Sequence, residues 1–244
     1  MTLVSLFIPI YNEERIIDFH IRKIKWVLEN LPQEFEIFIV DDASTDNSKR
    51  ILKEISESDK VVHHLRYEAG PTRRENLAQS FKKANGEIIA FMDMDLATNL
   101  KHLPTLISEV ENNADIAIGS RYVPGAKIKR RLLRRVISIA YNYFVRFYFS
   151  SKLSDHECGF KAFKRQVILN LVKEMGYDET LTRGVFWDTE LLVRAQFHSY
   201  KIKEIPIEWT EADKSALNFR REIKMIPYLL RFKKRLKKEQ IQNS

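Results

Sequence analysis

Residues 87–95 read EIIAFMDMD, an apolar run that ends in two aspartates one residue apart. Such a run is typical of a buried strand, in which alternate side chains point to the same side. If this geometry persists beyond Phe91, Asp93 and Asp95 point to one spot. Two carboxylates held that close repel each other. The stretch therefore predicts that a cation lies between them, that one is protonated, or that both face water.

Strand-like and helix-like segments alternate on both sides of this stretch. Strands are expected at 3–10, 36–42, 60–67, 87–93 and 115–120, with amphipathic helical patterns between them. Regular alternation of this kind predicts an α/β fold with a mostly parallel sheet and helices on both faces. Polar clusters follow four of the strands, and the carboxyl ends of parallel strands are where ligands bind in such sheets. A pocket is therefore expected at this edge.

The second half of the chain is less regular. It contains DHECGFKAFKR (155–165), a helix expected over 186–197, a strand over KIKEIPIEW (201–209) and a basic C-terminal helix. Neither an internal repeat nor a low-complexity linker is present. We expect one α/β domain over residues 1–215, followed by a basic amphipathic helical extension over residues 216–244.

The composition suits a packed enzyme domain. The 244 residues carry a formal net charge of +8, and the single cysteine excludes an internal disulfide. No basic segment precedes the first strand, so no signal peptide is expected. The most apolar long window, 132–149, contains three arginines, each of which costs roughly 2.5–3.5 kcal/mol at the centre of a bilayer. That window is expected to lie on a membrane rather than to cross it.

Five motifs occur in a fixed order: FIPIYNEE, FIVDDASTDNS, NGEIIAFMDMDLAT, IAIGSRY and CGFKAF. Together they resemble family 2 glycosyltransferases of the GT-A fold, and among them the polyprenyl- or dolichyl-phosphate sugar transferases. The resemblance covers about residues 3–210. It implies that Asp93 and Asp95 lie beside the diphosphate of a nucleotide sugar and that at least one of them binds Mg²⁺ or Mn²⁺. A hard divalent cation takes oxygen ligands from carboxylates and phosphates together.

The resemblance also assigns the donor site. Pro9, Tyr11 and Glu13 match its P-x-Y-N-E motif, and Asp41 and Asp42 match its V-D-D motif. These five residues are expected to bind the base and ribose of the donor. Carboxylates suit this role because an ionised carboxylate accepts hydrogen bonds from hydroxyl and N–H groups.

Arginines are expected to bind phosphate on the acceptor side. Arg121, in GSRY, is assigned to the diphosphate or the acceptor phosphate, and Arg131 and Arg135 to the acceptor phosphate. A guanidinium presents a planar fork that suits phosphate. In the loop EAGPTRRENLAQSF, Arg73 or Arg74 is expected either near phosphate or exposed at the surface.

Asp95, Arg121 and Asp188 are the expected catalytic residues. A phosphate monoester already carries about −1.5 to −2 charge at pH 7, so it needs cations and positioning more than a general base. Asp188 is therefore expected to position or to act electrostatically. The alternative is a soluble transferase that acts on a glycan hydroxyl and uses Asp188 as its base.

The expected reaction is an inverting transfer to a polyprenyl or dolichyl phosphate. DLAT, CGFKAF and IEWTE resemble the glucosyl branch of the family more than the mannosyl branch, so UDP-glucose is the expected donor and GDP-mannose the alternative. The amphipathic segments 128–149 and 219–238 are expected to hold the enzyme on the cytoplasmic face of a membrane, as a peripheral or monotopic protein. A nucleic-acid partner is not expected, because the strand-end aspartates would repel phosphate and no nucleic-acid module is recognisable.

Overall fold

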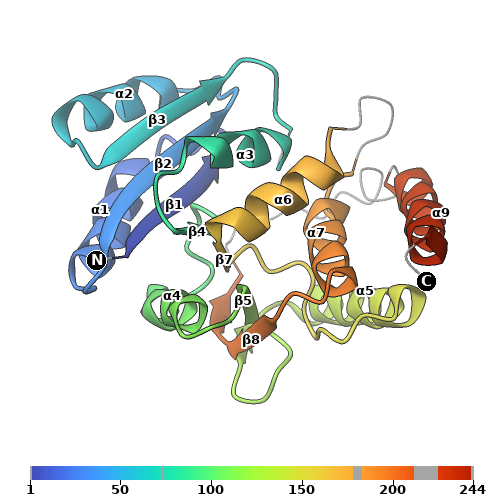
Figure 1. Cartoon of the computed structure of the whole chain (residues 1–244). Helices are drawn as coiled ribbons and strands as arrows, with labels where there is room; N and C mark the ends of the chain where they lie inside the picture. Colours follow the sequence, from blue (N-terminus) through green and yellow to red (C-terminus); the bar gives the residue numbers. More distant parts are fainter. Residues whose placement is uncertain (1, 73, 178–182, 212–224, 243–244) are drawn as a thin grey trace.

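The computed structural model describes residues 2–72, 74–177, 183–211 and 225–242. A seven-stranded sheet forms its centre, in the order β3-β2-β1-β4-β7-β5-β8, and every strand is parallel to its neighbours except β7 (Figure 1). The strands are β1 (Leu3–Ile10), β2 (Glu34–Asp42), β3 (Val62–Tyr67), β4 (Ile88–Phe91), β5 (Ile116–Ser120), β7 (Lys161–Lys164) and β8 (Ile202–Pro206). The predicted α/β fold with a mostly parallel sheet is confirmed.

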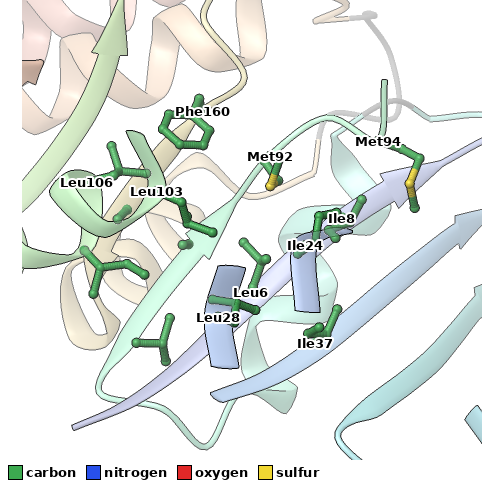
Figure 2. Packing of buried hydrophobic residues seen from close by; sticks show 14 of the residues in the cluster. Leu6, Ile8, Ile24, Leu28, Ile37, Met92, Met94, Leu103, Leu106 and Phe160 are labelled. Carbon is green, nitrogen blue, oxygen red and sulfur yellow. The ribbon is translucent and has the colours of Figure 1, made fainter. Parts of the chain in front are cut away.

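Helices cover both faces of the sheet, as the alternation predicted. On one face, α1 (Ile17–Glu29), α2 (Ser48–Ser58) and α4 (Leu103–Glu111) contribute to one hydrophobic cluster with Leu6 and Ile8 of β1. Figure 2 shows the part of this cluster that α1 and α4 form with the sheet. The opposite face carries α3 (Glu75–Ser80), α6 (Arg165–Met175) and α7 (Phe186–Phe197). Two short 3-10 helices, η1 (Phe81–Lys83) and η2 (Leu100–His102), follow α3 and precede α4.

Strand β1 shows why this arrangement forms. Leu6 and Ile8 point into one core and Phe7 into the other, and all three side chains are buried. A strand covered on both faces needs a continuous apolar run rather than alternation, which is what LVSLFIPI provides. Phe7 stacks on Phe38 of β2 at a centroid distance of 4.6 Å and meets Phe81 edge to face.

Strand β7 is a central element that the sequence did not indicate. It lies antiparallel between β4 and β5, with Lys161 opposite Phe91 and Ile118. Because β7 runs against its neighbours, its first residue lies at the edge of the sheet where β4 ends. The segment that precedes β7 is thereby brought next to the two aspartates that follow β4.

A second, two-stranded sheet connects distant parts of the chain. It pairs β6 (Lys127–Lys129) with β9 (Glu208–Thr210), in parallel. Strand β9 also contacts the segment after the aspartates: the Thr210 backbone N–H donates to the Ala97 carbonyl oxygen, and the Asn99 N–H donates to that of Glu208. One strand therefore holds both the segment 97–99 and the segment 127–129.

Two long helices complete the structure, α5 (Leu132–Phe149) and α9 (Ile226–Gln242). They meet α7 at the end of the molecule that lies far from the N-terminus (Figure 1). A separate hydrophobic cluster joins the three helices and includes Phe149, Phe186 and Phe232. Among the described residues, no helix combines the length and the apolar character needed to cross a membrane.

The structure changes the expected role of the C-terminal helix. The buried side of α9, which carries Tyr228, Leu229, Phe232 and Leu236, packs against the protein itself. That side is therefore closed to a bilayer, and Ile226 and Leu230 are the large apolar residues exposed on the described part of α9. The expected division at residues 215 and 216, and residues 219–224 of the expected membrane segment, lie outside the described residues, so the domain boundary stays a prediction.

Candidate functional site

The polar strand ends meet at the point where the strand order reverses. From β1 the chain continues outward to β2 and β3, whereas β4 lies on the other side of β1. In open α/β sheets, ligands bind outside the carboxyl ends of the strands at such a switch point. The ends of β1, β2 and β4 carry most of the predicted donor-site residues, which are therefore brought to one edge.

The two aspartates after β4 follow the alternation that the sequence predicted. Met92 and Met94 are buried in the core, whereas Asp93 and Asp95 are exposed at the edge of the sheet (Figure 2). Partial removal from water and the like charge of Asp93 raise the pKa of Asp95. The Ala97 N–H donates to Asp95 Oδ1 at 3.0 Å, and this hydrogen bond fixes the turn that follows.

Four charged side chains form a cluster beneath this edge: Arg74, Asp93, Lys161 and Asp188. Arg74 Nη1 lies 3.0 Å from Asp93 Oδ1, and Arg74 Nε lies 3.1 Å from Asp188 Oδ2. Lys161 Nζ lies 2.6 Å from Asp188 Oδ1. Burial would raise the pKa of Asp188, but Lys161 and Arg74 outweigh it and hold the pKa below its usual range.

Gly159 closes one side of the cluster. A Cβ at this position would lie 2.1 Å from Asp93 Oδ2 and 2.8 Å from Arg74 Nη2. A side chain at this position would displace the Asp93 carboxylate, the Arg74 guanidinium or the chain itself. The glycine of CGFKAF therefore lets the chain that enters β7 approach the carboxylate after β4.

The segment after β1 is bound to the segment after β2. The Asn12 N–H donates to Ser44 Oγ at 3.0 Å, and Asn12 Oδ1 accepts from the Thr45 N–H at 2.7 Å. The Glu13 N–H donates to Ser48 Oγ at 3.1 Å. Of the other predicted residues here, Pro9 is the penultimate residue of β1 and Tyr11 is exposed directly after it. These contacts fix how the predicted donor-site segments face each other.

Asp41 and Asp42, at the end of β2, are buried and serve the fold as well as the predicted site. Burial would raise the pKa of Asp41, but the His64 ring, with Nε2 3.6 Å from Asp41 Oδ2, and hydrogen bonds from Ser44 and Arg66 hold that pKa well below the usual range. Asp42 accepts from the Thr72 N–H at 2.7 Å and from Asn76 Nδ2 at 2.6 Å. Burial outweighs these bonds and raises the pKa of Asp42. Both carboxylates thus order the walls of the predicted pocket.

The aspartate pair fits a hard divalent cation bound together with a substrate. Mg²⁺ typically takes one or two protein carboxylates and completes its shell with phosphate oxygens and water. No group of three or more His, Cys, Asp or Glu residues in the described part of the chain could hold a metal. For such a cation, Asp93 and Asp95 would be the protein ligands, and a diphosphate and water the others.

Arg121 occupies a different environment from the one expected for a phosphate ligand. Its Nε and Nη2 donate to the two carboxylate oxygens of Asp155 at 2.7 and 2.8 Å, and the Arg121 N–H donates to Asp155 as well. Glu157 lies 3.5 Å from Arg121 Nη2. Both Arg121 and Asp155 are buried. The guanidinium therefore already has two anionic partners, and its role toward phosphate stays a prediction.

A pocket of about 470 Å³ lies between the end of β5 and helix α5. Arg121, Arg135 and Arg146 contribute its cationic wall, and Ile139 and Tyr143 belong to its apolar wall. The full lining is Arg121, Tyr122, Val123, Pro124, Ala126, Ile128, Arg135, Ile139, Asn142, Tyr143, Arg146 and Ser154. No ion pair of Arg135 or Arg146 is present within the part of the chain that the structure describes.

The other cations of the basic run 127–135, including Arg131, lie elsewhere. Arg131 is exposed, does not line the pocket, and uses its backbone N–H to bind Glu211. Arg134 pairs with Glu211 and Lys127 with Glu208. The guanidinium of Arg130 lies over the ring of Trp209 and pairs with neither Glu208 nor Glu211. Arg135 is thus the cation of the run 127–135 that the structure brings to the pocket.

Several residues of the site were not found from the sequence. Lys161 and Asp155 are positioned by ion-pair partners more than ten residues away in the sequence. Arg146 reaches the pocket because of the fold of α5. Arg74 was left between a phosphate role and surface exposure, and its side chain is only 14% exposed. Arg73 lies outside the described residues.

The sequence was compared with known proteins. The family described as "Glycosyl transferase family 2" matches residues 5–171. The glycosyltransferase AglD of Haloferax volcanii is 34% identical over 223 residues, which are 90% of this chain and 35% of that protein. The dolichyl-phosphate beta-glucosyltransferase of Saccharomyces cerevisiae is 30% identical over 234 residues, or 88% of this chain and 69% of that protein. The chain thus spans about a third of AglD.

Solved structures share the fold. Glucosyl-3-phosphoglycerate synthase from Mycobacterium tuberculosis, in complex with UDP, has a TM-score of 0.66 at 15% identity and covers 96% of this chain and 80% of its own. The mannosyltransferase PcManGT from Pyrobaculum calidifontis, in complex with GDP-Man and Mn²⁺, has a TM-score of 0.60 at 16% identity and covers 93% and 64%.

The family match extends over most of the sheet and includes the segments that carry Asp41, Asp93 and Arg121. Relatives named dolichyl-phosphate beta-glucosyltransferase confirm the predicted resemblance to the glucosyl branch. The chain belongs to glycosyl transferase family 2.

Proposed function

We propose that this glycosyltransferase moves glucose from UDP-glucose to a polyprenyl or dolichyl phosphate, with inversion, at a membrane surface. The pocket between β5 and α5 is the observation that carries the proposal. It combines two arginines that have no ion-pair partner among the described residues with an apolar wall. A phosphate attached to an isoprenoid chain needs both kinds of surface.

The donor would bind at the carboxyl ends of β1, β2 and β4. Asp93 and Asp95 would hold Mg²⁺ or Mn²⁺ there, which when bound neutralises charge on the departing nucleoside diphosphate. Pro9, Tyr11, Glu13, Asp41 and Asp42 would line the base and ribose. The M. tuberculosis synthase has been crystallised with Mn²⁺ and UDP, which supports the fold's capacity for such a donor.

The acceptor phosphate would bind to Arg135 and Arg146. Both are exposed and line the pocket, whereas Arg121 is neutralised by Asp155 and would shape the pocket from behind. Arg121 also lies over the ring of Trp209, at 5.6 Å, in the strand that contacts the segment after the two aspartates. The donor and acceptor sites would therefore be neighbours across β9.

A lipid phosphate suits the state of Asp188. Its carboxylate lies between Lys161 and Arg74, and its pKa is held low, so it is a weak base. An acceptor that is already ionised does not need its proton removed. Asp188 would instead hold the two cations in place, which disfavours a glycan hydroxyl as the acceptor.

Helix α5 supplies a surface on which the enzyme would lie on the membrane. Ser138, Asn142, Val145 and Phe149 face the protein. The opposite side exposes the large apolar residues Leu132, Leu133, Val136, Tyr143, Phe144 and Phe147. Tyr143 belongs to this apolar stripe and also lines the pocket, so a lipid chain could pass from the stripe to the arginines. Because nucleotide sugars are made in the cytoplasm, the enzyme would act on the cytoplasmic face.

The test measures transfer of labelled sugar into butanol-extractable lipid. Purified enzyme is incubated with detergent, polyprenyl phosphate and Mn²⁺, with either UDP-glucose or GDP-mannose. We expect label from UDP-glucose, lost with EDTA and in Asp95→Asn, and reduced at least tenfold in Arg146→Gln through a raised KM for the lipid. Arg22→Gln, on the exposed side of α1, serves as the matched control.

The outcomes separate the alternatives. Label from GDP-mannose instead would assign the mannosyl donor. If UDP-glucose binds in the presence of Mn²⁺ but no lipid is labelled, the lipid acceptor is wrong. Transfer to a soluble glycan that Asp188→Asn abolishes would then favour the hydroxyl-acceptor alternative.

A further inference from the structure

We infer that Arg74 is an internal counter-ion of Asp93 that competes with the divalent metal and moves to the diphosphate when the donor binds. The inference rests on the proposed function, because it concerns the order in which metal and nucleotide enter that site. Arg74 thereby makes tight metal binding depend on the nucleotide. The sequence left Arg74 between a place near phosphate and the surface, and it assigned Arg74 no contact with Asp93.

The first step is the geometry of the ion pair. Arg74 Nη1 lies 3.0 Å from Asp93 Oδ1, on the carboxylate proposed to bind the metal. The Arg74 side chain is 14% exposed, whereas that of Asp93 is 49% exposed. The guanidinium therefore approaches Asp93 from the protein side and leaves the other side open to solvent.

The second step is that Arg74 has two anchors. Its Nε donates to Asp188 Oδ2 at 3.1 Å, and its guanidinium carbon lies 5.3 Å from the centroid of the Phe91 ring. These contacts hold the Nε side of the guanidinium in place while Nη1 exchanges its partner. Lys161 remains bound to Asp188 throughout, so that carboxylate stays paired.

The third step is the confinement of Asp93. The Gly159 backbone is so close to the ion pair that an added Cβ would lie 2.1 Å from Asp93 Oδ2 and 2.8 Å from Arg74 Nη2. Asp93 therefore cannot swing away from Arg74 toward Gly159. A metal ion that arrives alone meets a carboxylate whose charge is already neutralised, and two cations close together on one carboxylate repel each other.

A nucleoside diphosphate changes this balance. Its phosphate oxygens give Arg74 a new anionic partner and supply the metal with further ligands. Both cations then have partners, and the competition ends. Metal and nucleotide are therefore expected to strengthen each other's binding, with Arg74 contributing to that coupling.

The test measures binding without turnover. Mn²⁺ affinity is determined from the electron paramagnetic resonance signal of the free ion, with and without UDP, and UDP affinity is determined by calorimetry without metal. Wild type is compared with Arg74→Gln, with Arg74→Lys, which keeps the charge, and with Arg22→Gln as a surface control. Arg74→Met, which keeps a long apolar side chain beside Phe91, is used if the Gln variant does not fold.

We expect Arg74→Gln to bind Mn²⁺ alone at least about tenfold more tightly than wild type and to bind UDP alone several-fold more weakly. Arg74→Lys should show a smaller change in both affinities, and Arg22→Gln none. Unchanged or weaker Mn²⁺ binding in Arg74→Gln, with UDP still bound, would overturn the inference alone. A wild-type protein that binds neither UDP nor Mn²⁺ with UDP would overturn the proposed function.

Discussion

At the scale of single residues, the position of the Asp93 carboxylate is set by neighbours that approach it closely from distant parts of the sequence. The carboxylate of Asp93 is held between Arg74 and the backbone of Gly159. Neither neighbour is close to Asp93 in the sequence, and each comes from a different loop. The position of the carboxylate is thus a property of three segments together.

Gly159→Ala is expected to weaken Mn²⁺–UDP binding by at least about tenfold, or about 1.4 kcal/mol. The added methyl group would overlap Asp93 Oδ2 and displace the carboxylate or the strand entry. Calorimetric titration of Mn²⁺–UDP measures the loss. Gly176→Ala is the control: its φ of +57° predicts a lower stability, but nothing lies within 4 Å and binding should be unchanged. Equal affinity in Gly159→Ala and wild type would contradict the geometry described here.

The sequence predicted the exposed pair of aspartates because strand alternation is a local property. Met92 and Met94 face the core and Asp93 and Asp95 face outward, as a period of two requires. The partners of these acids were not predictable in the same way. Arg121, whose assignment to phosphate stays a prediction, is bound by Asp155, which is 34 residues away in the chain.

At the scale of elements, α9 is bound to the domain by a buried polar network as well as by apolar packing. The Tyr228 hydroxyl donates to Glu190 Oε2 at 2.6 Å and accepts from Arg183 Nε at 2.9 Å. Glu190 is also paired with Arg194. This network lies one turn from the start of α7, the helix that carries Asp188.

Tyr228→Phe is expected to lower the free energy of unfolding by about 1–3 kcal/mol, because it leaves a buried carboxylate without one of its donors. Urea unfolding followed by circular dichroism measures the change. Tyr143→Phe removes the same hydroxyl from an exposed residue of α5 and should leave stability unchanged. If the two variants have the same free energy of unfolding, the Tyr228 hydroxyl does not anchor α9.

The exposed stripe of α5 predicts a loss of membrane binding when it is charged. Phe147→Glu, at a side chain that is 89% exposed, should reduce co-sedimentation with anionic vesicles several-fold and leave the folded state intact. The matched control is Phe19→Glu, at a side chain of α1 that is 59% exposed. Helix α1 lies at the opposite end of the molecule from α5 (Figure 1). Vesicle binding that is insensitive to Phe147→Glu would place the membrane contact elsewhere.

The elements differ in how far the sequence determined them. Helix α7 has the bounds expected from FWDTELLVRAQF, and it is buried on nearly all sides. Strand β7 was missed because KAFK has lysines where a central strand usually has apolar residues. Both lysines are accommodated by long-range ion pairs, Lys161 with Asp188 and Lys164 with Asp115.

At the scale of the whole molecule, one buried histidine predicts how stability depends on pH. His156 Nδ1 lies 2.8 Å from Asn142 Oδ1, and Nε2 lies 2.7 Å from Ser151 Oγ. Burial lowers the pKa of His156 from 6.5 to about 4. Below pH 6.5 the unfolded chain therefore binds a proton at His156 that the folded chain does not bind. The free energy of unfolding consequently decreases as the pH is lowered from 6.5 to about 4.

His156→Gln should remove this part of the pH dependence. Between pH 7 and pH 4.5 the wild type is expected to lose roughly 2–3 kcal/mol more than the variant, since one pKa unit corresponds to about 1.4 kcal/mol. Urea unfolding at both pH values measures the difference. Parallel losses in the two proteins would mean that His156 is not buried in its neutral form.

The antiparallel strand β7 also affects how the chain assembles during synthesis. Strands β4 and β5 both pair with β7 and not with each other, although β7 is made after both of them. Until the ribosome has passed Lys164, each therefore presents an unpaired edge, and such edges invite pairing with other chains. A fragment that ends at Ser120 is expected to aggregate rather than to fold as an independent half.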